Sequence, residues 1–134
     1  MLSTQDHLDI LGLYEHYNHA IDAADASAWA ATYTEDCVFD SPRATVSGRA
    51  GLEQYVRARD SSPAAQAVRP ERHWNAEIRI SGDGAHASGS CLLLLSGIQV
   101  ETGKTVVMTS GSYTDELVKT ASGWRFVRRT VHTG

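Results

Sequence analysis

Helical and strand-like hydrophobic patterns occupy different parts of the chain, and this separation constrains the fold more than any other feature. Apolar residues recur at three- and four-residue steps up to about Asp60, whereas strand-like apolar runs begin at about Arg72. Helices that precede the strands, rather than alternate with them, are typical of an α+β domain in which one curved sheet packs against the helices. The 134 residues, 42% of them hydrophobic, suffice for one domain with its own core. We therefore predict a single α+β domain over residues 1–134.

Three helices are predicted before the strands. The first runs from Thr4 to Ala23, because its apolar residues form a single stripe at helical spacing: Ile10, Leu13, Tyr14, Tyr17 and Ile21. Asp25 can cap a second, short helix that carries Trp29 and Tyr33 on its buried side and ends at the polar stretch TED. The third helix covers the stretch SGRAGLEQYVRARD, and its inward-facing residues are Leu52, Tyr55 and Val56.

The strands are predicted from turn signals and apolar runs. Between the second and third helices, the stretch CVFD indicates a short strand that Pro42 stops, and a polar loop, SSPAAQAVRP, follows the third helix. Beyond Pro70, four strand-type runs are separated by the turn-rich clusters SGDG, ETGK and KTASG. These runs predict an antiparallel meander, so the sheet should be bent and mostly antiparallel.

Composition and motifs exclude several classes of function. The net charge of −4 comes with scattered Lys and Arg, so no basic patch is offered to nucleic acid. No phosphate-binding glycine loop or dinucleotide fingerprint occurs, and His16 with His19 would give a metal only two ligands, so we expect no cofactor and no metal. Cys37 and Cys91 lack paired spacing and no signal peptide precedes them, which predicts a cytoplasmic protein. The longest apolar run, CLLLL, is too short to span a membrane.

The same run predicts an assembly. Leu92 to Leu95 are apolar at every position, so both faces of this strand should be covered, one by the helices and the other by a second subunit. The stretch VVM in the next strand extends the apolar surface. We therefore expect a homodimer packed through the outer face of the sheet.

The stretch ERHWNAEIRI carries the strongest signal for chemistry. His73 and Asn75 are two residues apart, so a regular strand directs both side chains to one face. A histidine can accept and return a proton at physiological pH. However, Trp74, Ala76 and Ile78 define the apolar alternation, so His73 faces the core only if a β-bulge resets the register. Without such a bulge, His73 would be a structural histidine.

Three segments together resemble a known family over nearly the whole chain. The segments YNHAIDAADASAWAATYTEDCVFDSP, RHWNAEIRISGDGAHASGSCLLLL and GWRFVRRTV are similar to the SnoaL-like group of the nuclear-transport-factor-like superfamily. This resemblance implies a cone-shaped α+β barrel with a deep pocket between the sheet and the first helices. The superfamily includes ketosteroid isomerase, scytalone dehydratase, bile acid 7α-dehydratase, polyketide cyclases, epoxide hydrolases and the non-catalytic small subunits of ring-hydroxylating dioxygenases. The fold alone therefore does not select a reaction.

The resemblance also implies roles for individual residues. His73 matches the position of the base in the dehydratases, and Tyr17 and Asp22 match the Tyr and Asp spacing on the first helix of bile acid 7α-dehydratase. An Asp at the place of Asp22 orients the histidine in scytalone dehydratase. The alternatives are core packing for Tyr17 and a solvated helix end for Asp22. The second acid or base of these dehydratases falls on small or aliphatic residues in ASGSCLLLL, so it is missing here.

Asp40 is a rival centre. In ketosteroid isomerase the base lies at the end of the first short strand, just before a proline, and the stretch FDSP places Asp40 and Ser41 there. A gapless match puts Ser41 rather than Asp40 on the base, and a turn-forming role for Asp40 is the better interpretation. We retain Asp40 as a substrate-binding candidate.

These observations predict a cofactor-free pocket for a small, hydrophobic, cyclic substrate that bears a carbonyl group. His73 would move a proton next to the carbonyl, Asp22 would hold the imidazole, and Tyr17 would donate a hydrogen bond to the oxygen as it gains charge. The reaction would be dehydration, isomerisation or cyclisation, and the alternative is a non-catalytic binding or partner domain. The predicted walls and contacts of the pocket are Tyr14, Trp29, Phe39, Trp74 and Asn75.

Overall fold

The computed structural model describes all 134 residues. Its helices are α1 (Thr4–Asp22), α2 (Ala26–Ala30), α3 (Gly48–Asp60) and α4 (Pro63–Ala67). Its strands are β1 (Tyr33–Asp40), β2 (Thr45–Ser47), β3 (Val68–Gly82), β4 (His86–Gln99), β5 (Thr105–Thr120) and β6 (Gly123–Thr133). They form one sheet in the order β2-β1-β6-β5-β4-β3, and of its neighbouring pairs only β1 and β6 run parallel. The predicted α+β class and the antiparallel meander of the last four strands are confirmed.

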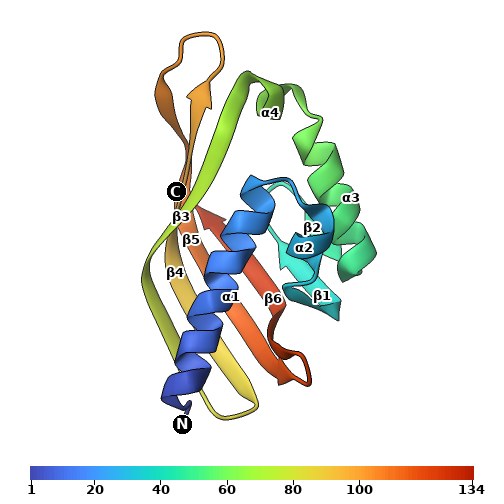
Figure 1. Ribbon diagram of the computed structural model, residues 1–134, viewed down its shortest axis with the longest axis vertical. Helices are drawn as coiled ribbons and strands as arrows, with labels where there is room; N and C mark the ends of the chain where they lie inside the picture. The colour runs from blue at the N-terminus through green and yellow to red at the C-terminus, as the bar shows by residue number, and fades with distance from the viewer.

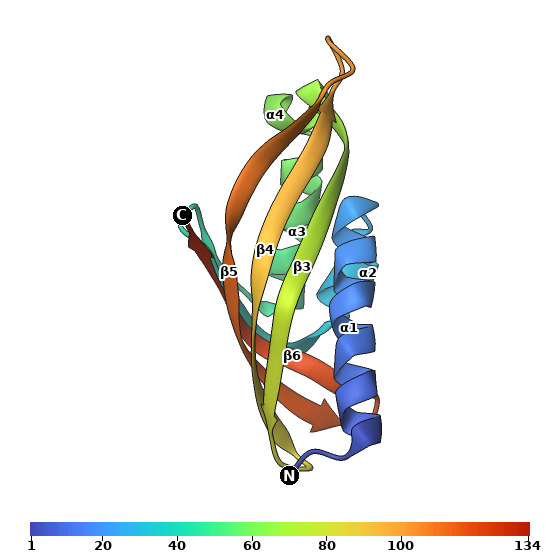
Figure 2. The same cartoon turned by 90° about the vertical axis from the view of Figure 1, so that its left-hand side faces the viewer.

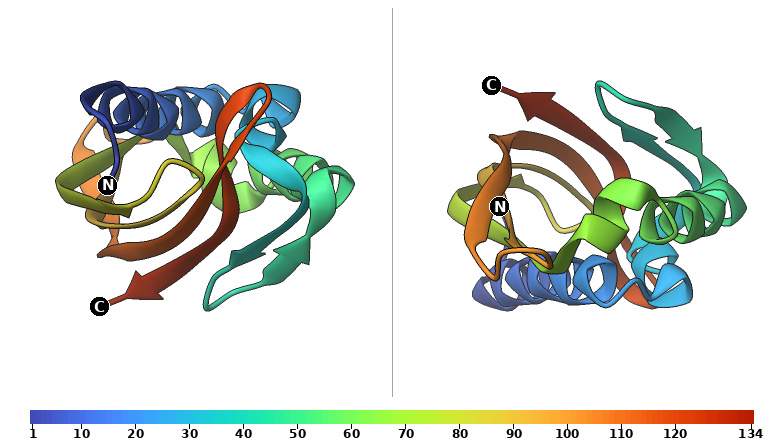
Figure 3. Two further views of the ribbon diagram at one scale, coloured as in Figure 1. Left: turned by 90° about the horizontal axis from the view of Figure 1, so that it is seen from below. Right: turned by 90° about the horizontal axis from the view of Figure 1, so that it is seen from above.

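The sheet is strongly curved, and α1 lies along its concave side (Figure 1, Figure 2). In the end-on views the strands curl toward the helices, so that α1 and α3 close different sides of the interior (Figure 3). This arrangement is the cone shape that the family resemblance implies. None of the four helices has the length and apolar character needed to cross a membrane.

Helix α1 is anchored at both its first turn and its buried stripe. Ser3 and Asp6 form a capping box, in which the Ser3 hydroxyl accepts from the Asp6 N–H at 3.0 Å and the Ser3 N–H donates to the Asp6 carboxylate. The same carboxylate accepts from Trp124 Nε1 and Lys119 Nζ, each at 3.0 Å, which ties the helix to the last hairpin. The predicted apolar stripe is buried along its whole length.

Two local predictions were wrong, and both errors have physical causes. Tyr33, predicted on the second helix, begins β1, because α2 ends at Ala30 and Tyr33 pairs with Phe126 of β6. That partner lies far along the chain, so the local pattern could not indicate it. The predicted polar loop contains α4, in which the Ser62 hydroxyl accepts from Ala65 N–H and Pro63 occupies the first turn.

Strand β3 changes face at a β-bulge. Glu77 adopts a positive φ of 51°, and the register with β4 shifts between Ala76 and Arg79. As a result His73 lies on the same concave side as Ile80, which packs against the core. In a regular strand, two residues seven positions apart would point to opposite faces. The bulge that the sequence analysis required for an inward-facing His73 is therefore present.

Candidate active site

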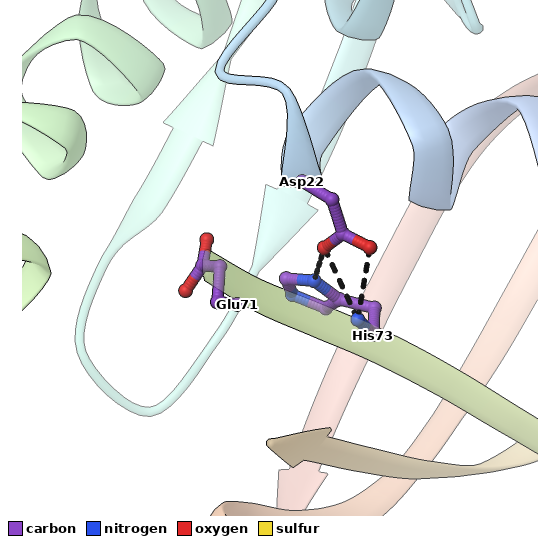
Figure 4. A group of neighbouring side chains, drawn as sticks. All are labelled: Asp22, Glu71 and His73. Atoms are coloured by element: carbon purple, nitrogen blue, oxygen red, sulfur yellow. Dashed lines mark hydrogen bonds and ion pairs between the residues drawn. The ribbon is translucent and has the colours of Figure 1, made fainter. Parts of the chain in front are cut away.

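Asp22 and His73 form a hydrogen-bonded pair between the end of α1 and β3 (Figure 4). The ring Nδ1 of His73 lies 2.6 Å from Oδ1 of Asp22, and the His73 backbone N–H donates to both carboxylate oxygens at 3.1 Å. A carboxylate only accepts, so Nδ1 carries the hydrogen and Nε2 is the nitrogen left to take up a proton. The bond to Asp22 fixes the orientation of the ring, and the side chain, which is 9% exposed, still reaches a cavity.

A second side-chain contact supports this pair. Asn18 Nδ2 donates to Asn75 Oδ1 at 2.8 Å, and Asn75 Nδ2 donates to the Leu92 carbonyl of β4 at 3.2 Å. Asn18 and Asp22 are one helical turn apart, about 6 Å, and His73 and Asn75 are about 6.6 Å apart along an extended strand. The two spacings match, so α1 and β3 meet through two parallel contacts, and Asn75 serves this interface rather than the cavity lining.

The His73 ring lines a cavity of about 360 Å³ inside the cone. Leu93 and Leu95 of β4 lie beside His73, since Leu95 is its direct cross-strand partner. Both residues are leucines, so this side of the cavity is apolar and offers no second acid or base beside His73. The other aromatic walls are Phe39, Tyr55 and Tyr113.

The two tyrosines of this lining are neutral hydrogen-bond donors. Burial raises the pKa of Tyr55, and burial raises the pKa of Tyr113 well above its ordinary value of 10.0. Both phenols therefore keep their protons at neutral pH and can donate hydrogen bonds into the cavity. Tyr55 was predicted to face inward from its place on the third helix, but its place in the cavity was not.

Arg59 and Glu71 form an ion pair at one end of the cavity. Both terminal nitrogens of the Arg59 guanidinium donate hydrogen bonds to the Glu71 carboxylate, and the Nη2–Oε2 distance is 2.9 Å. Burial opposes the charge on Arg59, but the hydrogen bonds and charge of Glu71 outweigh it, so the pKa of Arg59 is raised. This pair was missed by the sequence analysis, because α3 and β3 come together only in the fold.

Asp22, Glu71 and His73 each place one potential metal-ligand atom within 4.8 Å of the others (Figure 4). However, the Glu71 oxygens are both bound by Arg59, and the Asp22 oxygens are both bound by His73. A metal ion would have to break these hydrogen bonds, and the Arg59 guanidinium and the His73 N–H groups would then lose their acceptors. The geometry therefore fits a hydrogen-bonded ion-pair cluster better than a metal centre.

The remaining predicted residues lie outside the cavity lining, apart from Phe39. Tyr14, Tyr17 and Trp29 are buried in the core, where the Tyr17 ring packs edge-on against Tyr113 with ring centroids 6.2 Å apart. Tyr17 thus stands one layer behind a residue that lines the cavity, and its predicted donor role stays a prediction.

Trp74 and Asp40 also lie outside the cavity lining. Trp74 is on the outer face of the sheet, where its Nε1 donates to Ser96 Oγ, because neighbouring strand residues point to opposite faces. Asp40 ends β1 and accepts from Arg128 and from the Thr45 hydroxyl, each at 2.9 Å. These partners agree with its interpretation as a turn-forming residue, and its neighbour Ser41 lines the cavity instead.

A fully buried ion pair lies behind the cavity. Arg129 donates through Nε and Nη2 to the Asp115 carboxylate at 2.7 and 2.9 Å, and the Tyr14 hydroxyl donates to the same group. The guanidinium lies 3.7 Å from the ring centroid of Tyr113 and 4.4 Å from that of Tyr17. Burial opposes the Arg129 charge, but Asp115 outweighs it and raises the pKa of the guanidinium well above its ordinary value.

A second bulge explains why the burial of Arg129 could not be predicted from the sequence. Simple alternation from the buried Phe126 would place Arg128 inside and Arg129 outside. The pairing of β5 with β6 shifts between Glu116 and Leu117, and the shift turns Arg129 into the core. No local pattern in GWRFVRRTV indicates that shift.

Comparisons with known proteins agree with the fold and show the family of the chain. Residues 3–130 match the model of the SnoaL-like domain, and no curated protein matches the sequence. Among solved structures, a protein of unknown function from Mycobacterium tuberculosis is 28% identical, with 95% of this chain and 70% of that chain covered and a TM-score of 0.83. A candidate aromatic ring hydroxylase from Novosphingobium aromaticivorans is 25% identical, with 99% and 92% covered and a TM-score of 0.82. A candidate scytalone dehydratase from the same organism is 22% identical, with 98% and 89% covered and a TM-score of 0.81, which shows a shared fold. The chain belongs to the SnoaL-like domain family.

Proposed function

We propose that this protein is a cofactor-free enzyme that moves a proton next to the carbonyl group of a small, hydrophobic, cyclic substrate. The observation that carries the proposal is the His73 ring, held through Nδ1 by Asp22 at 2.6 Å while it lines a cavity of about 360 Å³. A base, a residue that orients it and a cavity beside the base that can hold a ring are the elements that such chemistry needs. Similarity to a candidate scytalone dehydratase adds support at the level of the fold.

The proposed reaction begins at Nε2 of His73. This nitrogen removes the proton from the carbon next to the carbonyl, and the Asp22 carboxylate stabilises the imidazolium that forms. In a dehydration, the enolate expels the hydroxyl group from the β carbon, and the imidazolium returns the proton to it as water leaves. In an isomerisation the proton returns to another carbon. One acid–base residue suffices for both, which fits the absence of a second one on β4.

The enolate oxygen needs a hydrogen-bond donor. The sequence analysis predicts Tyr17 for this role, but Tyr55 lines the cavity and Tyr17 does not. Tyr113 also lines the cavity, but we favour Tyr55, because Tyr55 is half-buried whereas Tyr113 is only 3% exposed. Tyr55→Phe and Tyr17→Phe distinguish the two assignments. Removing the oxyanion donor lowers kcat by about 10²- to 10³-fold, whereas the substitution of a tyrosine outside the cavity lining should have a smaller effect.

The proposal is tested with a β-hydroxytetralone, which yields a naphthol on loss of water, and with a β,γ-unsaturated cyclic ketone. His73→Ala should lower the rate by about 10²- to 10⁴-fold on whichever compound is converted. His19→Ala is the matched control, because this histidine is exposed on α1 and is absent from the cavity. Equal rates for the native protein and His73→Ala would refute the proposed role of His73.

The absence of a second acid or base favours one other function. Leu93 and Leu95 make the wall beside His73 apolar, as expected if the domain only binds a hydrophobic ligand or a partner subunit. In that case no ring ketone would be converted, although ligands would still bind. A polyketide cyclase would use the same proton abstraction, followed by carbon–carbon bond formation by the enolate.

We also propose that the protein forms a homodimer through the outer face of the sheet. Leu92 and Leu94 are 47% and 38% exposed, and Trp74 beside them is 51% exposed. An apolar sheet face of this kind is typical of a subunit contact. Sedimentation at micromolar concentration measures the assembly, and Leu94→Lys should shift a dimer to monomer. A monomeric native protein would contradict the proposal.

A further inference from the structure

The charge of the cavity is opposite to that of the whole protein. The chain has 16 acidic residues and 12 Lys and Arg residues. The cavity, however, is lined by Arg43, Arg59 and His73 and by no Asp or Glu. Such an arrangement in an acidic protein indicates a site that attracts a negatively charged group.

Arg43 is the cation without a partner. It lies in the loop between β1 and β2 and makes no hydrogen bond or ion pair with another residue of the chain. Arg59 is different, because Glu71 neutralises it through two hydrogen bonds. The free positive charge at the cavity is therefore that of Arg43, an exposed residue at its rim.

Hydroxyl groups of β5 and β6 add donors to the same cavity. Thr109, Ser110 and Thr133 line it, and their hydroxyls make no hydrogen bond within the chain. Phe39, Leu93 and Leu95 form the apolar part of the lining. The cavity thus offers an apolar surface for a ring together with a cation and free hydroxyl donors for a polar group.

We propose that the substrate of this site is a cyclic carboxylate whose carboxylate group binds Arg43. The proposal rests on the proposed function, since it assigns the substrate class of the same cavity. A single free guanidinium matches one carboxylate, with two parallel hydrogen bonds. A phosphate is less well served, because no glycine-rich loop or helix N-terminus is among the lining residues.

The test compares naphthalene-2-carboxylate with naphthalene-2-carboxamide, which has the same shape without the charge. Titration calorimetry should show at least about tenfold tighter binding of the carboxylate to the native protein, and added salt should weaken only the carboxylate. Arg43→Gln should remove most of this difference and leave carboxamide binding unchanged. Arg57→Gln is the matched control, because Arg57 is exposed on α3 and does not line the cavity.

Equal affinities for the two compounds, or binding of neither, would overturn the proposal. Loss of carboxylate binding in Arg57→Gln as well as in Arg43→Gln would also overturn it, since it would indicate a general charge effect. The proposed function is judged separately by turnover in His73→Ala. If binding is charge-selective but turnover does not depend on His73, the carboxylate site is supported and the proposed mechanism is refuted.

Discussion

Removing one member of the buried Arg129–Asp115 pair should cost a large part of the stability of this protein. Both side chains are 0% exposed, so Asp115→Asn leaves a guanidinium charge in the core with no anion beside it. Breaking a buried ion pair in this way costs about 3–5 kcal/mol. The aromatic rings around Arg129 offset only part of this, since a cation–π contact contributes about 0.5–2 kcal/mol.

The matched double variant separates the charge effect from packing. Asp115→Leu combined with Arg129→Met replaces both charges with apolar groups, and such replacements are often neutral or stabilising. The Tyr14 hydroxyl then loses its acceptor, which costs about 1–3 kcal/mol. We therefore expect the double variant to be more stable than Asp115→Asn alone, despite two substitutions.

Urea unfolding followed by tryptophan fluorescence measures these differences. With a slope of about 2 kcal/mol per molar urea, a loss of 3–5 kcal/mol lowers the midpoint by about 1.5–2.5 M. The reasoning is refuted if Asp115→Asn costs less than about 1 kcal/mol, or if the double variant loses more stability than the single variants Asp115→Leu and Arg129→Met together.

Three further predictions follow from other contacts. Asn18→Ala removes the second contact between α1 and β3, so kcat should fall by about 10- to 100-fold with little change in KM. Asn18→Gln should recover part of the lost kcat. An unchanged kcat in Asn18→Ala would show that the Asp22–His73 pair keeps its geometry without this contact. Hydrogen bonds from Trp124 and Lys119 hold the pKa of Asp6 well below its ordinary value of 3.8, so its stabilising effect is complete above pH 3.8 and is lost as the pH falls toward the lower folded-state pKa. The urea midpoints of the native protein and Asp6→Asn should therefore converge on acidification, and a constant difference would contradict this. Burial raises the pKa of Cys91 to about 11, so a disulfide exchange reagent at neutral pH should label this thiol only after urea unfolding. The assay uses the Cys37→Ser variant, in which Cys91 is the remaining thiol. Rapid labelling of this variant in its folded state would contradict the prediction.

Much of the fold and part of the site could be predicted from the sequence, because their causes are local. The apolar stripe of α1 is a matter of residues three and four positions apart, and Asp25 caps α2 through an N–H three residues away. The hairpins after Pro70 follow from turn residues between apolar runs. The family resemblance pointed to Asp22 and His73 as partners, and the structure brings them into contact.

The tertiary structure alone decided which polar side chains of the strands face the interior. The bulge at Glu77 turns His73 toward α1, and the register shift between β5 and β6 turns Arg129 into the core. Alternation along a single strand cannot reveal either shift, because a bulge depends on the register of the partner strand. The same reasoning applies to Tyr33, which joins β1 through pairing with β6 almost a hundred residues later, at Phe126. The sequence determined the elements, and the pairing between distant strands determined which of their charged groups became buried and which came to line the cavity.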